Sequence, residues 1–256
     1  MQTYKNKENK GIIMTKAPVN IVCMKWGTKF GPQYVNKLYK MVEKNLTLPH
    51  RFVCFTDNSK GLDKGIETLP LPEVIFEDGP ERGWKKLGIF AKKLGNLKGE
   101  ALFLDLDTLI LRNIDDFFKV KGDFLIIKDW DFKNYVGNSS VFKFTIGKHP
   151  DVLEYFEKNR FDIRKKFRNE QAYLSYFMMK KGILKYWDKK WCISFKRHCL
   201  WPFPLNWFKT PKLPKDAKIL IFHGHPNPEE AFKGYTTKYG FRHIKPTYWL
   251  NDFWKV

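Results

Sequence analysis

Two aspartates interrupt an apolar run in "ALFLDLDTLILRN", residues 101–113. A bare carboxylate in such surroundings is costly unless it is paired, protonated or bound to a cation. Asp105 and Asp107 stand two positions apart at the end of a predicted strand, so their side chains share one face. A hard divalent cation, Mn²⁺ or Mg²⁺, would neutralise both. The structural alternative is that one aspartate caps a turn or pairs with a basic residue such as Arg112.

A sheet must position these carboxylates, and the sequence predicts one. After residues 1–17, expected to be a flexible basic tail, short apolar segments alternate with amphipathic ones, which is typical of an α/β fold. Amphipathic helices are predicted from Pro32 onward, over 81–95 and over 169–182, and irregular structure over 186–217. Apolar content predicts strands over 19–24, 51–56, 101–106, 123–129, 139–144 and 217–224.

Composition narrows the class of protein and of partner. The chain has 256 residues and is 43% hydrophobic, which is ample for a packed core. Its 47 Lys and Arg against 27 Asp and Glu give a net charge of +20, which favours an anionic partner. No apolar run reaches the roughly 20 residues of a spanning helix, and the first residues lack an apolar signal, so a cytoplasmic location is expected. The four cysteines form no CxxC pattern and are expected to be free thiols.

Two enzyme classes place a DxD motif after a buried strand. Haloacid dehalogenase-like phosphatases carry DxDGT near the N-terminus, whereas here Thr108 directly follows Asp107 with no glycine between them. The ordered motifs "VNIVCMKWG", "FVCFTDN", "GWKKLGIF", "ALFLDLDTLI", "YVGNSSVFKF", "NEQAYLSYF" and "ILIFHGHPNP" resemble the DxD glycosyltransferases of the GT-A fold, related to family 8 and to bacterial lipopolysaccharide and capsule transferases. The resemblance implies a GT-A domain over residues 18–232 and a C-terminal extension, 233–256, packed on it or lying at a surface.

The resemblance also implies an activity and assigns roles to residues. The activity is metal-dependent transfer of a sugar from a nucleoside diphosphate sugar, with a UDP-sugar favoured, to a glycan or lipid-linked glycan acceptor. His223 in "FHGHP" matches the histidine that completes the metal site with Asp105 and Asp107, although the family's following lysine is not in register here. The remaining matched positions are Lys86 for the diphosphate or donor sugar, Asn138 and Ser139 for sugar hydroxyls, and Glu170 and Gln171 beside the reacting carbon.

Several candidates also have an ordinary structural interpretation. Lys25, Trp26, Thr56 and Asp57 follow predicted strands where a nucleoside could bind, but Asp57 equally suits a turn. A lysine such as Lys86 on an amphipathic helix is often only solvated. "GNSS" could be a turn before a strand, and Glu170 could simply favour a helix start.

Asp129 and Asp131 in "IIKDWDF" bear on the stereochemistry. An inverting transferase needs a carboxylate base near the acceptor hydroxyl, and either residue could serve, with Trp130 offering a face to a sugar ring. A retaining enzyme needs no such base. The resemblance to family 8 favours retention.

The rival functions are a nucleic-acid or anionic-surface binder and a phosphatase. Lysines are scattered along the whole chain rather than gathered in one stripe, so nucleic acid is the less favoured partner. Residues 186–256 mix tryptophan and phenylalanine with lysine, and we expect them to dock on the acceptor or on an anionic membrane at its inner face. The alternative is that these aromatic residues pack in the core.

Overall fold

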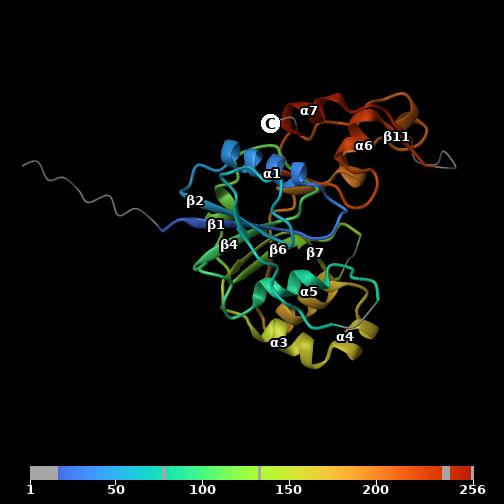
Figure 1. Ribbon diagram of the computed structural model, residues 1–256. Coiled ribbons are helices and arrows are strands. Elements are labelled where there is room, and N and C mark those ends of the chain that lie inside the picture. The colour runs from blue at the N-terminus through green and yellow to red at the C-terminus, as the bar shows by residue number, and fades with distance from the viewer. Residues whose placement is uncertain (1–16, 77–78, 132–133, 238–242, 255–256) are drawn as a thin grey trace, which may run out of the picture.

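The computed structural model describes residues 17–76, 79–131, 134–237 and 243–254. All but the last residue of the predicted tail, 1–17, therefore lies outside the described residues. A seven-stranded mixed sheet in the order β3-β2-β1-β4-β7-β6-β8 runs through the centre (Figure 1). Its strands are β1 (Val19–Lys25), β2 (His50–Thr56), β3 (Glu67–Leu69), β4 (Glu100–Leu104), β6 (Phe124–Lys128), β7 (Gly137–Thr145) and β8 (Leu184–Tyr186).

The direction of the strands brings distant segments to one edge. Strand β1 pairs in parallel with β2 and with β4, so all three end at the same edge of the sheet. Strand β7 runs antiparallel to β4, so its first residues lie beside the last residues of β4. The backbone N–H of Asp105 donates to the carbonyl of Ser140 at 2.9 Å. This edge is where an open α/β sheet binds ligands.

Both faces of the sheet are covered, which explains why its central strands are apolar without alternation. In β4, Leu102 and Leu104 belong to one hydrophobic cluster, and Ala101 and Phe103 belong to the other. Figure 1 shows α1, α6 and α7 on one side of the sheet and α3, α4 and α5 on the other. The mixed α/β architecture predicted from the sequence is confirmed.

The first layer is built on α1 (Pro32–Asn45), which begins at the predicted proline and buries Val35, Leu38 and Val42. A second sheet, ordered β5-β10-β9, packs into the same cluster. Its strands are β5 (Thr108–Ile110), β9 (Cys192–Ser194) and β10 (Ile219–Ile221). The other elements are α2 (Asp116–Lys119), η2 (Phe195–Cys199), η3 (Leu205–Trp207), α6 (Pro228–Lys233), β11 (Tyr235–Thr236), β12 (His243–Ile244), η4 (Tyr248–Leu250) and α7 (Asn251–Trp254).

The second layer contains η1 (Trp84–Phe90), α3 (Asp151–Lys158), α4 (Arg160–Lys166) and α5 (Glu170–Lys180). Helix α5 starts as its sequence predicts, because the side chain of Asn169 accepts a hydrogen bond from the N–H of Ala172 at 3.2 Å. It ends before Gly182, whose φ of 71° suits the left-handed position after a helix.

The prediction of an amphipathic helix over 81–95 is wrong. The segment forms only the 3₁₀ helix η1, Trp84–Phe90, and the chain turns extended at Ala91. Gly83 precedes it with φ 84°, and a Cβ on Gly88 would lie 2.8 Å from the Pro72 Cβ. This close approach fixes η1 under the neighbouring loop, and Lys86 is largely buried rather than solvated.

Some aromatic residues of the C-terminal region pack in the core, and others are exposed at the surface. Trp187, Phe195 and Trp254 are buried, and the ring of Trp254 meets Tyr34 of α1 edge-on at 5.3 Å between centroids. Large apolar side chains remain exposed mainly in the segment 203–213, at Phe203, Leu205, Trp207, Phe208 and Leu213. The end of the described chain is therefore part of the core.

Within the described ranges, no helix is both long enough and apolar enough to cross a bilayer. Cys23, Cys54, Cys192 and Cys199 are all buried free thiols. Burial raises the pKa of Cys192 well above its ordinary value, so this thiol stays protonated.

Candidate active site

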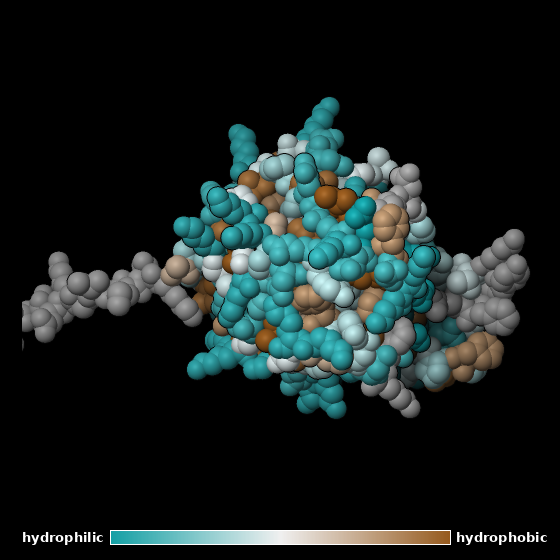
Figure 2. Space-filling model, turned by 90° about the horizontal axis from the view of Figure 1, so that it is seen from below, coloured by the Kyte–Doolittle hydropathy of each residue, from teal (hydrophilic) through white to brown (hydrophobic). Residues whose placement is uncertain are grey.

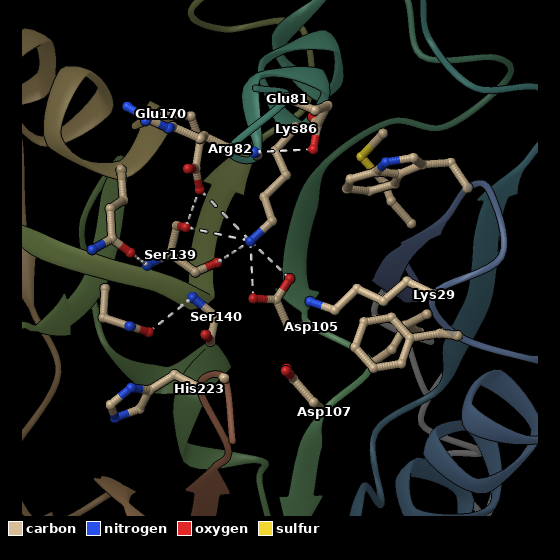
Figure 3. A pocket seen from close by; sticks show the side chains of 18 of the residues that line it. Lys29, Glu81, Arg82, Lys86, Asp105, Asp107, Ser139, Ser140, Glu170 and His223 are labelled. Carbon is tan, nitrogen blue, oxygen red and sulfur yellow. Dashed lines mark hydrogen bonds and ion pairs between the residues drawn. The ribbon is translucent and has the colours of Figure 1, made fainter. Parts of the chain in front are cut away.

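A cavity of about 420 Å³ opens at the edge of the sheet where β1 and β4 end (Figure 3). We call it the main cavity. Its walls come from the loop after β1, the turn before η1, the DxD segment, the start of β7, the start of α5 and the residues after β10. The lining residues are Met24, Lys25, Trp26, Lys29, Phe30, Glu81, Arg82, Gly83, Lys86, Asp105, Leu106, Asp107, Asn138, Ser139, Ser140, Glu170, Gln171, Phe222, His223 and Gly224.

Lys86 stands at the centre of an acidic network. Its Nζ lies 2.8 Å and 2.9 Å from the two carboxylate oxygens of Asp105 and 3.7 Å from Oε1 of Glu170. Its distance to Oγ of Ser139 is 3.4 Å. Arg112, the partner considered for an aspartate in the sequence, donates instead to the carbonyls of Pro214 and Ala217. Asp105 therefore does pair with a basic residue, as the structural alternative expects, but that residue is Lys86.

Burial and charge oppose each other in this network. Burial alone would lower the pKa of Lys86, but Asp105 and Glu170 outweigh it, so the pKa is raised and the ammonium stays charged. Burial also raises the pKa of Glu170, although Lys86 and the hydroxyl of Ser139, which donates to its carboxylate, favour the charged form. Gly83 leaves space for this carboxylate, because an added Cβ would collide with Glu170.

Asp107 is in a different electrostatic position. Burial and the nearby charge of Asp105 raise its pKa to about 7, against the attraction of Lys29 and Lys86. In the part of the chain that the structure describes, no ion pair or side-chain hydrogen bond reaches its carboxylate. A divalent cation beside Asp105 and Asp107 would remove this penalty, and carboxylate oxygens are the ligands that Mn²⁺ and Mg²⁺ prefer. The aspartate pair therefore fits such an ion.

His223 lines the main cavity, but its ring is directed elsewhere. Its Nε2 lies 2.7 Å from the Ser194 hydroxyl, and the ring stacks on Trp130 with centroids 5.7 Å apart. Figure 3 shows the imidazole turned away from the two aspartates. Among the described residues, no three His, Cys, Asp or Glu side chains are placed to hold a metal ion together. His223 could join the aspartates only by leaving Ser194, and its role as a ligand stays a prediction.

No family model and no curated protein matches the sequence. Solved structures do match. The galactosyltransferase LgtC, in complex with donor and acceptor sugar analogues, aligns with a TM-score of 0.58 at 14% identity over 82% of this chain and 88% of its own. The glycosyltransferase GlyE of Streptococcus pneumoniae TIGR4 aligns with a TM-score of 0.55 at 13% identity over 82% of this chain and 56% of its own. The chain has the fold of these glycosyltransferases.

Most of the predicted contact residues surround the main cavity of this glycosyltransferase fold. Lys25 at the end of β1 and Trp26 directly after it line the main cavity, and Asn138 and Ser139 line it at the start of β7. The side chain of Gln171 links a residue of the cavity wall, Ser139, to Asp129 behind it. Its Oε1 accepts from the N–H of Ser139 at 3.4 Å, and its Nε2 donates to Asp129 at 3.4 Å.

Four predicted residues do not line the main cavity. Asp57 accepts a hydrogen bond from the N–H of Gly27 at 2.8 Å, and the hydroxyl of Thr56 donates to the carbonyl of Asn58 at 3.0 Å. Both therefore shape the loops next to the main cavity. Asp131 pairs with Arg197 at 2.8 Å, and Asp129 accepts from the N–H of Asp131 at 2.8 Å.

Lys29, Phe30, Arg82 and Ser140 line the main cavity, and sequence reasoning missed them. Each lies within a few positions of a residue that was singled out. The order of the strands could have pointed to these residues, because the loops that follow parallel strands gather at one edge of a sheet. Lys29 follows the predicted strand at 19–24, and Arg82 precedes the motif "GWKK".

Proposed function

We propose that this protein is a glycosyltransferase that moves a sugar from a nucleoside diphosphate sugar, with a UDP-sugar favoured, to a glycan or lipid-linked glycan acceptor. One observation carries the proposal. Paired carboxylates and the ammonium groups of Lys29 and Lys86 converge on one cavity at the ligand-binding edge of a glycosyltransferase fold. Such a mixture suits a donor with an anionic diphosphate and a neutral sugar.

The charged residues would serve the diphosphate. When the bond between sugar and diphosphate breaks, the departing oxygen gains negative charge, and a site arranged in advance to receive it lowers the barrier. A bound Mn²⁺ or Mg²⁺ at Asp105 and Asp107 would stabilise the negative charge that develops on the departing diphosphate. Lys86 holds a fixed position between Asp105 and Glu170, so its charge needs no rearrangement during the reaction.

The polar and aromatic residues of the main cavity would bind the neutral parts of the donor. Asn138, Ser139 and Gln171 offer hydrogen-bonding groups to sugar hydroxyls. Trp26 and Phe30 offer flat apolar surface to a nucleobase. Asp129 and Asp131 lie outside the cavity lining, which supports a reaction that retains configuration over one that uses either as a base.

The decisive experiment is a panel of nucleotide sugars assayed for hydrolysis and transfer with Mn²⁺ and with EDTA. We expect one donor to be consumed in a Mn²⁺-dependent manner. Asp107→Asn should abolish Mn²⁺-dependent UDP binding, whereas the exposed control Asp216→Asn should bind UDP as the native protein does. UDP affinity that is equal with Mn²⁺ and EDTA would overturn the metal site, and failure of every donor to bind would overturn the function.

The exposed segment 203–213 supports a peripheral location at an anionic membrane. Phe203 and Phe208 are 76% and 74% exposed, and Lys209 and Lys212 lie over the ring of Trp201 at 4.4 Å and 3.9 Å. Aromatic and basic side chains together suit a membrane interface. Phe203→Ser combined with Phe208→Ser should reduce binding to phosphatidylglycerol vesicles and leave UDP binding intact. Unchanged vesicle binding would rule out this segment as the docking surface.

A further inference from the structure

A second cavity lies on the other side of Arg82. It has a volume of about 300 Å³ and is lined by Pro80, Arg82, Trp84, Phe161, Arg164, Lys165 and Arg168. We call it the basic cavity, because four of these side chains are cationic and none of them is acidic. Figure 2 views the molecule from the side of α3 and α4 and shows a surface made mainly of hydrophilic side chains.

Three of the four cations of the basic cavity have no carboxylate partner within the described chain. They are Arg82, Lys165 and Arg168. Arg82 donates to the backbone carbonyl of Arg168 at 3.2 Å, and Arg164 donates to that of Pro80 at 3.4 Å. Cations gathered around one hollow repel each other and attract an anion from solution.

Arg82 is held in place by its own turn. It has a φ of 43°, a backbone conformation that is unfavourable for a residue with a side chain. Glu81 secures the turn by accepting hydrogen bonds from the N–H groups of Gly83 at 3.1 Å and Lys85 at 2.9 Å. As a result, Arg82 lines both the main cavity and the basic cavity.

The remaining wall of the basic cavity is apolar. Trp84 is buried and stacks on Phe156 with centroids 5.0 Å apart, which gives the cavity a rigid floor. Phe161 is 58% exposed at the rim. An aromatic rim beside cations suits a ligand that combines a sugar ring with an anionic group.

We propose that the basic cavity binds an anionic group, phosphate or carboxylate, carried by the glycan acceptor. The assignment of that ligand as an acceptor rests on the proposed transferase function, because the shared residue Arg82 places the basic cavity next to the proposed donor site. The acceptor is then an acidic glycan, and the basic cavity selects it over a neutral one.

A matched pair of double variants tests this. Lys165→Gln with Arg168→Gln removes two positive charges from the basic cavity without touching the main cavity. Lys40→Gln with Lys44→Gln removes the same charge from the exposed surface of α1, on the opposite face of the sheet. Each protein is titrated calorimetrically with glucose 6-phosphate, glucuronate and glucose, with the main cavity saturated by UDP and Mn²⁺.

We expect the native protein to bind an anionic sugar more tightly than glucose. The Lys165→Gln, Arg168→Gln variant should lose about tenfold in that affinity, in line with the loss of two charge-assisted contacts, while the control variant loses none. The phosphate and carboxylate arms identify the anion. The hydrolysis of donor should be the same in all three proteins.

The proposal is overturned if the anionic sugars bind no better than glucose, or if the double variant binds them as well as the native protein. It is also overturned if single-stranded DNA binds in place of the sugars and is lost in the double variant. Failure of UDP to bind would overturn the proposed transferase function, but the titrations with anionic sugars would still decide whether the basic cavity is an anion site.

Discussion

The main cavity and the basic cavity share Arg82 but handle charge in opposite ways. In the main cavity, the buried ammonium of Lys86 is fixed by the carboxylates of Asp105 and Glu170. In the basic cavity, the cations Arg82, Lys165 and Arg168 are exposed and have no carboxylate partner among the described residues. A compensated, buried network provides fixed geometry, which suits chemistry. An uncompensated, exposed cluster provides attraction, which suits capture and selection of a ligand.

The largest effect should come from breaking the compensation in the main cavity. Lys86→Met leaves Asp105, Asp107 and Glu170 without their shared cation, so we expect the free energy of unfolding at pH 8 to fall by about 3 kcal/mol. Donor turnover should fall by at least about a hundredfold. Urea denaturation at pH 8 measures the loss of stability. Lys85→Met is the control, and an equal loss in both variants would contradict the role given to Lys86.

The second prediction separates stability from function at Asp107. Its pKa is about 7 in the folded protein and about 4 in an unfolded chain. The folded state therefore binds more protons between these values, and stability falls as pH rises from about 4 to about 7, by an amount on the order of a few kcal/mol. Asp107→Asn removes this fall, so without metal the variant should be more stable than the native protein at pH 8. Denaturation curves at pH 4 and pH 8 check this, and parallel pH profiles for both proteins would refute it.

Salt should distinguish the two cavities. Raising ionic strength from 0.1 M to 1 M shortens the Debye length from about 10 Å to about 3 Å, which affects exposed charges far more than buried ones. We expect glucose 6-phosphate affinity at the basic cavity to fall by about tenfold and Mn²⁺-dependent UDP affinity to change by less than about threefold. Calorimetry over a NaCl series measures both. An equal salt dependence would remove the contrast between the cavities.

The smallest effect should come from the apolar rim of the basic cavity. Phe161 is 58% exposed, so Phe161→Ser should change the free energy of unfolding by less than about 0.5 kcal/mol. Its ring should matter only to the ligand, and affinity for glucose 6-phosphate should fall by about threefold, less than after loss of the cations. Thermal unfolding and calorimetry on one preparation test both statements. A larger effect than that of Lys165→Gln with Arg168→Gln would reverse the proposed order of contributions.

The parts of the fold that sequence could predict depend on local chemistry. Strand β1 and helix α5 were predicted because continuous apolar residues and the N-cap Asn169 act within their own segments. The structure of the segment 81–95 could not be predicted in this way. Its Lys86 points inward because it pairs with Asp105 and Glu170, which come from other elements.

The same limit applies within the site. The sequence places His223 at the end of a strand, and the structure agrees. The direction of its ring depends on Ser194 and Trp130, which are distant in the sequence. Arg82 was missed for a related reason, because its importance arises from a backbone turn that only the folded chain displays.

The main cavity is assembled from segments that run from Lys25 to His223 and depend on pairings between β1, β4 and β7. Such long-range contacts form late and slowly during folding. The binding site should therefore be absent from partly folded chains, and a ligand should stabilise only the complete native state. A rise in the melting temperature of the Lys165→Gln, Arg168→Gln variant, in which the basic cavity is weakened, would then report occupancy of the main cavity, so collections of nucleotides could be screened by heating before any acceptor is known.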